Sequence, residues 1–149
     1  MGAWLLVACA TLPPPTYTNV RSGPRPTPLA FPTAGAEEAI PQLIAAERTA
    51  AHIGDLGTLG QLWAEDAQVV DGRGTPHLAD DYLWSGRAAI LDRYVVAVFP
   101  NPPPLLDGPD GLVVNVEGDQ ATAVLGGDRW RFVRRDGRWW IAELVYSSP

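Results

Sequence analysis

The residue with the clearest capacity for chemistry is Glu143, in the last predicted hairpin of the chain. Asp136-Gly137 has the composition of a two-residue hairpin turn, so counting outward from it pairs Trp130 with Glu143. Because side chains alternate along a strand, one face then carries Trp130, Phe132, Trp139, Ile141, Glu143 and Val145. A carboxyl group among aromatic rings loses solvation, which raises its pKa toward the range of a general acid or base. The alternative is a carboxylate near the strand end that meets water or pairs with an arginine.

The other titratable residues give weaker evidence of a functional site than Glu143 does. Asp71, His77, Asp80 and Asp81 gather in one predicted loop region, but their spacing matches no known ligand pattern, so we expect a solvated acidic loop and no metal site. His52 ends the first predicted helix, where it suits the negative end of the helix dipole better than a place at a pocket mouth. The chain has no nucleotide-binding loop and no nucleophile elbow, and we therefore predict no cofactor.

Hydrophobic periodicity predicts the elements that position these residues. Helices are expected at 37–53, from the capping residue Asp55 to Trp63, and at 87–99. In the first of them Ile40, Leu43, Ile44, Glu47 and Ala51 fall near one face. Strands are expected at 67–71, 81–85, 112–117, 120–125, 128–135 and 138–147. The sequence therefore predicts an α+β fold that ends in an antiparallel meander.

Composition divides the 149 residues into three segments. Residues 36–149 form a single domain with enough apolar residues for one core, and residues 10–35 form a proline-rich, extended linker. Residues 1–9 resemble a bacterial lipobox ending in Cys9, which predicts an exported, cell-envelope lipoprotein whose only membrane contact is a lipid on Cys9. The alternatives are a short apolar terminus with a chance cysteine, or an uncleaved anchor. The net charge of −6 disfavours nucleic acid as a partner.

Four short motifs, in this order and spacing, resemble the NTF2-like superfamily and its SnoaL-like domains: residues 54–56 (GDL), 62–67 (LWAEDA), 85–90 (SGRAAI) and 136–141 (DGRWWI). The resemblance covers the whole domain. It implies a cone, in which a strongly bent and mainly antiparallel sheet wraps around three helices from the N-terminal half and leaves an apolar pocket at the open end. It also implies that Asp66, between the second helix and the first strand, is structural.

The resemblance turns the aromatic face of the last hairpin inward, which would place Glu143 in the pocket as the catalytic candidate. The aromatic residues expected to contact a ligand, unless they only fill the cone, are Trp63, Trp84, Tyr94, Trp130 and Trp139. The resemblance also implies dimerisation through the outer face of the sheet. Unless arginine stems simply cover the rings, the expected homodimer surface is Arg131, Trp140, Leu144 and Tyr146.

The superfamily includes enzymes and proteins that only bind or assemble, so the fold alone does not select a function. No catalytic set of an enzyme subfamily can be placed residue by residue on this chain. The first hypothesis is therefore a domain that binds a small apolar molecule or self-associates. The second is a cofactor-independent SnoaL-like isomerase or cyclase, with Glu143 as acid or base and Tyr94 or a tryptophan N–H as donor. The third is a purely structural interaction module.

Overall fold

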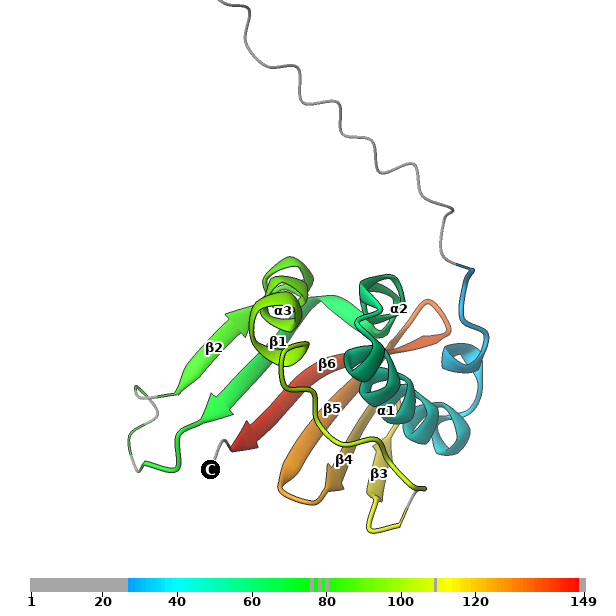
Figure 1. Ribbon diagram of the computed structural model, residues 1–149. Coiled ribbons are helices and arrows are strands. Elements are labelled where there is room, and N and C mark those ends of the chain that lie inside the picture. The colour runs from blue at the N-terminus through cyan, green and yellow to red at the C-terminus, as the bar shows by residue number, and fades with distance from the viewer. Residues whose placement is uncertain (1–26, 76, 78, 80, 109, 148–149) are drawn as a thin grey trace, which may run out of the picture.

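A single six-stranded sheet, in the order β2-β1-β6-β5-β4-β3, organises the computed structural model (Figure 1). The structure describes residues 27–75, 77, 79, 81–108 and 110–147. The predicted signal segment with Cys9, and the linker up to residue 26, lie outside the described residues. Lipidation of Cys9 and export therefore stay predictions.

The elements follow the predicted order of helices and strands. The strands are β1 Trp63–Gly72, β2 Tyr82–Ser85, β3 Val113–Glu117, β4 Gln120–Leu125, β5 Asp128–Arg135 and β6 Arg138–Ser147. The helices are the short 3-10 helix η1 Phe31–Thr33, then α1 Ala36–Ile53, α2 Leu56–Leu62, α3 Arg87–Arg93 and the π-helical turn η3 Tyr94–Val98. Strands β1 and β6 are parallel, and every other neighbouring pair is antiparallel. The predicted α+β class with a mainly antiparallel sheet is confirmed.

Local sequence explains where the helices begin and end. Gly54 ends α1 in a left-handed conformation, with φ of 75°, that few other residues adopt without strain. Asp55 caps α2, because its carboxylate accepts a hydrogen bond of 3.0 Å from the Thr58 N–H. Trp63 was expected in α2 but begins β1 with an extended backbone. Within the described part of the chain, none of these helices has the length and apolar character needed to cross a bilayer.

The third helix widens in its second half. The Phe99 N–H donates a 2.8 Å hydrogen bond to the Tyr94 carbonyl oxygen, five residues earlier, which is the spacing of a π-helical turn. The helix thus extends through most of the predicted span from Arg87 to Phe99, and the wide turn begins at the fully buried Tyr94.

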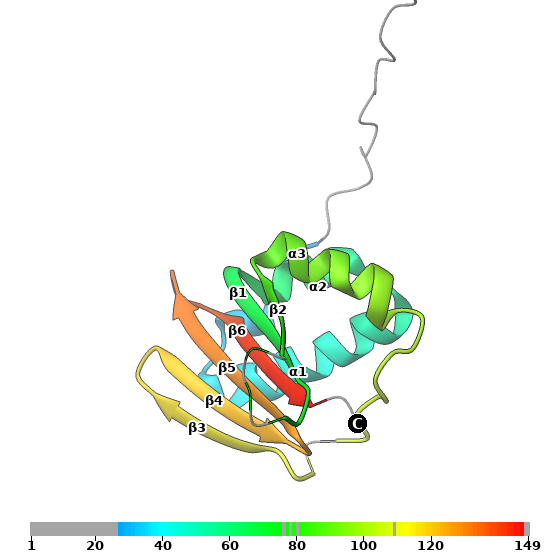
Figure 2. The same cartoon turned by 90° about the vertical axis from the view of Figure 1, so that its left-hand side faces the viewer.

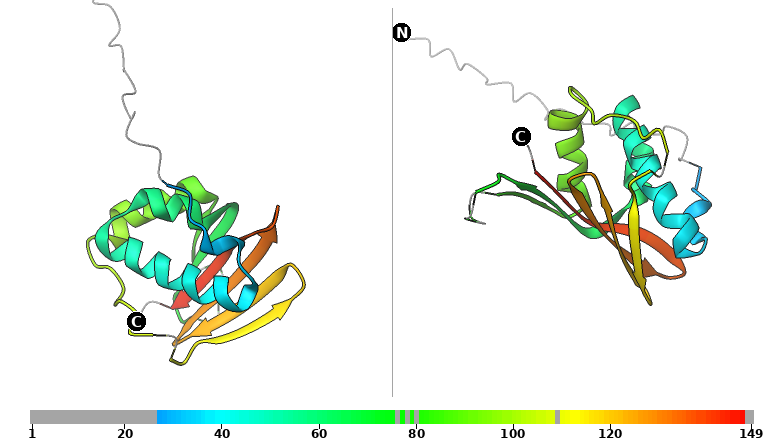
Figure 3. Two further views of the ribbon diagram at one scale, coloured as in Figure 1. Left: turned by 90° about the vertical axis from the view of Figure 1, so that its right-hand side faces the viewer. Right: turned by 90° about the horizontal axis from the view of Figure 1, so that it is seen from below.

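The helices lie on the concave side of the curved sheet (Figures 2 and 3). The space between these layers is the core. Its largest fully buried side chains are Trp63, Tyr94, Trp130, Phe132 and Trp139. Their burial accounts for much of the apolar surface that this small domain removes from water.

A β-bulge in β6 changes the face on which its second half lies. Phe132 pairs with Ile141, but Arg131 pairs with Glu143, so Ala142 is the extra residue between them. Because side chains alternate, one extra residue exchanges the two faces for everything that follows it. Leu144 now lies in the same cross-strand row as the inward-facing Trp130, and Glu143 lies in the row of Arg131.

Candidate functional site

The predicted position of Glu143 in the pocket is wrong, and the bulge at Ala142 is the reason. Glu143 lies on the outer face of the sheet, where its Oε2 is 3.4 Å from Nε of Arg131. Both side chains are partly exposed to solvent. The same bulge turns Leu144 and Tyr146 away from the expected dimer surface and into the concave side, where both line a cavity.

That cavity has a volume of about 720 Å³ and opens between the helices and the concave side of the sheet. Its walls come from α1, from α3 with the segment that follows it, and from strands of both halves of the sheet. Of the five aromatic residues expected to contact a ligand, Trp84 and Tyr94 line the cavity. Trp63, Trp130 and Trp139 do not; they are at most 2% exposed and belong to the core. These three rings fill the core of the cone, which was the alternative to contact with a ligand.

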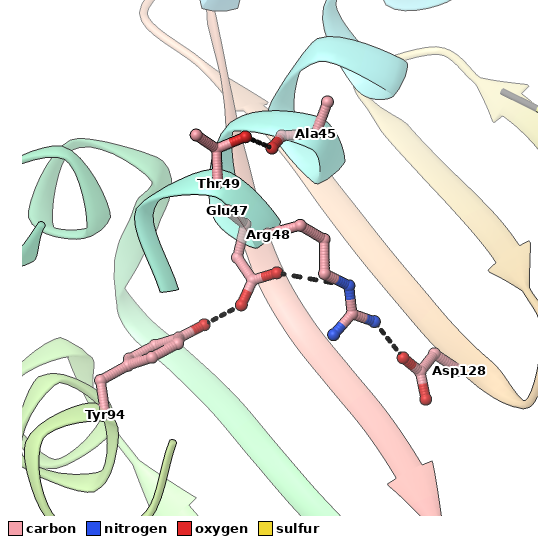
Figure 4. A network of polar contacts seen from close by, with 6 residues as sticks. All are labelled: Ala45, Glu47, Arg48, Thr49, Tyr94 and Asp128. Carbon is pink, nitrogen blue, oxygen red and sulfur yellow. Dashed lines mark hydrogen bonds and ion pairs between the residues drawn. The ribbon is translucent and has the colours of Figure 1, made fainter. Parts of the chain in front are cut away.

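Glu47 is the most deeply buried carboxyl group of the cavity wall, with 2% of the residue exposed. It projects from α1 toward η3, where the Tyr94 hydroxyl donates a short hydrogen bond to its Oε1 (Figure 4). Its second oxygen, Oε2, has no hydrogen-bond partner among the described residues and lies 3.8 Å from Nε of Arg48. Glu47 therefore has one carboxyl oxygen engaged by Tyr94 and one buried beside the Arg48 guanidinium without a hydrogen bond.

Burial is the largest influence on the pKa values of Glu47 and Tyr94. Desolvation raises the pKa of Glu47, and it outweighs the nearby Arg48 guanidinium and the Tyr94 hydroxyl, which lower it. The pKa of Tyr94 is raised well above its usual value, again by burial first and by Glu47 second. A carboxyl group with a raised pKa, held by a tyrosine beside a cavity, is suited to accepting and returning a proton.

A second polar connection anchors the cavity wall to the sheet. Arg48 forms a short ion pair with Asp128 at the start of β5 (Figure 4). Its guanidinium carbon lies 5.6 Å from the centre of the Trp130 ring. The arginine thus joins α1 to β5 and is neutralised by Asp128. Its contact with the ring adds a cation–π attraction to the ion pair.

Arg93 at the end of α3 is the most enclosed cation of the cavity, with 8% of the residue exposed. Its guanidinium lies near three aromatic rings, 4.9 Å from the centre of Tyr146, 5.0 Å from Trp84 and 5.8 Å from Tyr94. It forms no ion pair with any residue that the structure describes, and its Nε has no hydrogen-bond partner there.

The remaining candidates lie at the edge of the site or away from it. Asp71 lines the cavity, with its Oδ2 3.9 Å from Nη1 of Arg73, while Asp81 accepts a 3.0 Å hydrogen bond from the Arg73 N–H. Among the described residues no group of three or more His, Cys, Asp or Glu is placed to hold a metal ion. His52 is exposed at the end of α1 and does not line the cavity.

Asp66 makes a structural contact, in keeping with the role that the resemblance implies. Its two carboxylate oxygens accept hydrogen bonds of 2.7 and 2.9 Å from the guanidinium of Arg135. This exposed pair joins β1 to β5, and neither residue lines the cavity.

Glu47 and Arg93 are the two site residues that the sequence-based candidates lack. Glu47 occupies a position that the helical pattern assigns to a buried face, because it follows Ile40, Leu43 and Ile44 in α1. A charged residue on the apolar side of an amphipathic helix is therefore the feature that could have identified Glu47. Arg93 lies outside the apolar pattern of its helix, and the sequence gives no signal for its burial.

Comparison with known proteins supports the fold. No family model matches the chain, and no curated protein matches it. Among solved structures, it is similar to an NTF2-like protein with a cystatin-like fold from Novosphingobium aromaticivorans, with 26% identity, a TM-score of 0.55, and coverage of 74% of this chain and 80% of that one.

Two further solved structures agree. An NTF2-like protein of unknown function from Pseudomonas putida has 19% identity, a TM-score of 0.56, and coverage of 76% of this chain and 87% of that one. A hexachlorocyclohexane dehydrochlorinase from Novosphingobium barchaimii has 19% identity, a TM-score of 0.56, and coverage of 73% of this chain and 83% of that one. These likenesses confirm the predicted NTF2-like fold, which the first of these structures also describes as cystatin-like.

Replacing Glu47 with glutamine should make the protein relatively more stable as the pH rises. Arg48, Arg93, Tyr94 and Asp128 all act on this carboxyl group, and burial still raises its pKa above the ordinary value. Its contribution to stability is therefore fully present below the unfolded-state pKa and is lost as the pH rises through the folded-state pKa. We expect the melting temperature of Glu47→Gln, relative to wild type, to increase from about pH 4 to about pH 8.

The exposed Glu65 supplies the matched control, because Glu65→Gln removes a carboxyl group of the same type outside the core. Its melting temperature relative to wild type should show no comparable rise with pH. A Glu47→Gln variant that instead loses stability relative to wild type as the pH rises would contradict the raised pKa.

Proposed function

We propose that this domain binds a small organic molecule in the cavity on the concave side of its sheet. The volume of about 720 Å³ lies within the range of sites that enclose most of a small ligand. Trp84, Tyr82 and Tyr146 offer aromatic surface for a ring or another apolar body. The ligand expected from the sequence was apolar; the charged groups of the wall favour one that also carries a polar group.

The observation that carries this proposal is the burial of two ionisable groups against the cavity. Glu47 and Arg93 are 2% and 8% exposed, although each would be better solvated at the surface. Burying such groups costs stability that a small domain does not have in excess. A requirement to orient a ligand explains why they are placed together in this wall.

A blocking variant tests the site. Ala97 lines the cavity but is exposed, so Ala97→Trp should fold normally and obstruct the cavity, whereas Val96→Trp changes a neighbour that is 75% exposed and does not line it. A thermal-shift screen would use sterols, polyketide-like rings, terpenes and fatty acids. A ligand present at about 100 times its Kd should stabilise wild type by about 2.7 kcal/mol.

We expect Ala97→Trp to lose this stabilisation and Val96→Trp to keep it. If no compound stabilises wild type, the cavity does not bind these classes. If a compound stabilises Ala97→Trp as much as wild type, it binds elsewhere.

A second candidate function, proton transfer without a cofactor, is favoured by the contact between Glu47 and Tyr94. The carboxylate of Glu47 would remove a proton from a carbon next to a carbonyl group, and the electron pair of that bond would move to the carbonyl oxygen. The protonated Glu47 would then return the proton. One of the similar structures is a dehydrochlorinase, although at 19% identity that likeness extends to the fold alone. Glu47 takes the role that the sequence assigned to Glu143.

Solvent exchange measures this step in any compound that binds, whether or not it is the natural substrate. Each compound that stabilises the protein would be incubated with it in heavy water, and deuterium incorporation followed by NMR. We expect Glu47→Gln to lower the exchange rate by at least about 100-fold, the usual contribution of a general base. Glu143→Gln, on the outer face, should leave the rate unchanged. Absence of exchange in wild type, or equal rates in Glu47→Gln, would exclude this candidate and leave binding alone.

The outer face of the sheet supports self-association, although not through all of the expected residues. Trp140 is covered by the guanidinium groups of Arg87, at 5.6 Å, and Arg138, at 4.5 Å. A mainly apolar row, interrupted by the exposed Arg129, instead crosses the whole sheet. The register places side by side Val113, Val124, Arg129, Val145, Val70 and Leu83.

The neighbouring row contains the Arg131–Glu143 pair and uncharged polar residues: Asn115, Thr122, Gln68 and Ser85. A row whose one charged residue is Arg129, beside a row whose two charges neutralise each other, suits contact with a second copy of the same sheet. We propose that this mainly apolar row, together with Arg131, forms the homodimer surface.

Val124→Lys tests this surface because residue 124 is 43% exposed and lies within the row. A lysine buried against a second sheet would lack a partner, so we expect the dimer to weaken by at least about tenfold. The control Val95→Lys alters a valine on η3 that is 48% exposed and lies off the sheet. Molar mass by light scattering across a dilution series gives the result. A monomeric wild type, or a Val124→Lys dimer of normal strength, would contradict the assignment.

A further inference from the structure

We infer that the molecule bound in the cavity carries a carboxylate, and that Arg93 is the residue that binds it. This inference rests on the proposed function, since it names the chemical class of the ligand for that same cavity. It adds a specificity that neither the fold nor the similar structures supply.

The first observation is that Arg93 is a buried cation that forms no ion pair within the described residues, although its charge lowers the pKa of the nearby Glu47. Of the three arginines in the wall, Arg48 pairs with Asp128 and Arg73 lies 3.9 Å from Asp71. Arg93 is more buried than either and forms no ion pair within the described residues. Its Nε is inaccessible to water and has no hydrogen-bond partner there, although an arginine side chain has five N–H donors to satisfy.

The second observation is the charge balance of the cavity. Three carboxyl groups, those of Glu47, Asp71 and Asp128, face three guanidinium groups. Asp128 pairs with Arg48, and Asp71 lies 3.9 Å from Arg73. The two charged residues outside these pairs are Glu47 and Arg93. Burial raises the pKa of Glu47 and Arg93 lowers it, and the cavity holds one positive charge in excess only in the protonated state of Glu47. A ligand with a single negative charge restores neutrality in a region where an uncompensated charge is costly.

The third observation is the shape of the environment around Arg93. The rings of Trp84, Tyr94 and Tyr146 have their centres within 5.8 Å of the guanidinium carbon, so aromatic surface surrounds the charged group. The N–H donors lie in the plane of the guanidinium and point outward from its edge, so they remain the means of contact with a ligand. A carboxylate is planar and matches two parallel donors of this kind.

A phosphate group fits this site less well than a carboxylate. A phosphate carries more charge and usually needs several cationic or backbone donors, whereas the other two arginines of the wall already face aspartates. The aromatic surface beside Arg93 also suits a ligand in which a ring or chain adjoins the charged group.

A matched pair of probes tests the inference on the full chain. 2-Naphthoate and 2-naphthamide have the same ring system and nearly the same shape, but only the first is an anion near neutral pH. Dissociation constants would be measured by calorimetry, with NMR for weak binding. We expect wild type to bind naphthoate at least about tenfold more tightly than naphthamide, as is typical of a hydrogen bond to a charged group.

Arg93→Met retains the length of the side chain and removes the charge, so it should bring the two dissociation constants to within about twofold of each other. Arg135→Met is the control, because it removes an exposed arginine that pairs with Asp66 outside the cavity. It should retain the full preference for naphthoate. Ala97→Trp should weaken binding of both probes.

The outcomes distinguish failure of the carboxylate inference from failure of the proposed binding function. If naphthamide binds wild type as tightly as naphthoate, the carboxylate inference fails while the binding function stands. If neither probe binds, the carboxylate inference fails, and the thermal-shift screen with Ala97→Trp decides the binding function separately. If Arg93→Met folds and keeps the preference, the anion binds elsewhere and the assignment to Arg93 is overturned. The wild-type comparison decides the ligand class even if Arg93→Met does not fold.

Discussion

The hydrogen bond between Tyr94 and Glu47 is the contact on which the candidate site depends. It joins α1 to the π-helical turn η3 across one side of the cavity, through two residues that are 47 positions apart in the sequence. Because both groups are buried, the hydrogen bond is stronger than it would be in water, and either group without the other would carry a large desolvation cost. The same contact therefore fixes the cavity wall and controls the protonation of its most buried carboxyl group.

The cavity wall combines features that a merely structural core would avoid. Aromatic rings enclose Arg93, two aspartates face arginines, and Glu47 lies where its charged form is disfavoured. Apolar residues of similar volume would often stabilise such a site as well or better. The polar wall is thus best understood as a cost of function, and the core of Trp63, Trp130 and Trp139 beside it maintains the fold.

The sequence was sufficient for the architecture and insufficient for the site. Periodicity and the Asp136-Gly137 turn predicted the helices, the meander and the pairing near the turn. The bulge at Ala142 left no trace in the sequence, because β6 contains neither glycine nor proline, and every face assigned beyond it was therefore reversed. The π-helical turn likewise arises from packing. Glu47 was visible on the apolar face of its helix, but the reason for its burial lies in residues brought together only by the fold.

The bulge has a consequence for how such domains diverge. Insertion or deletion of one residue near position 142 would exchange the interior and exterior sets of side chains in the last strand, with no substitution at all. Leu144 and Tyr146 would move to the exterior, and Glu143 would enter the cavity. In this strand, chain length is as much a determinant of pocket chemistry as residue identity. An ungapped alignment with a homologue that lacks the bulge would equate cavity residues of one protein with surface residues of the other.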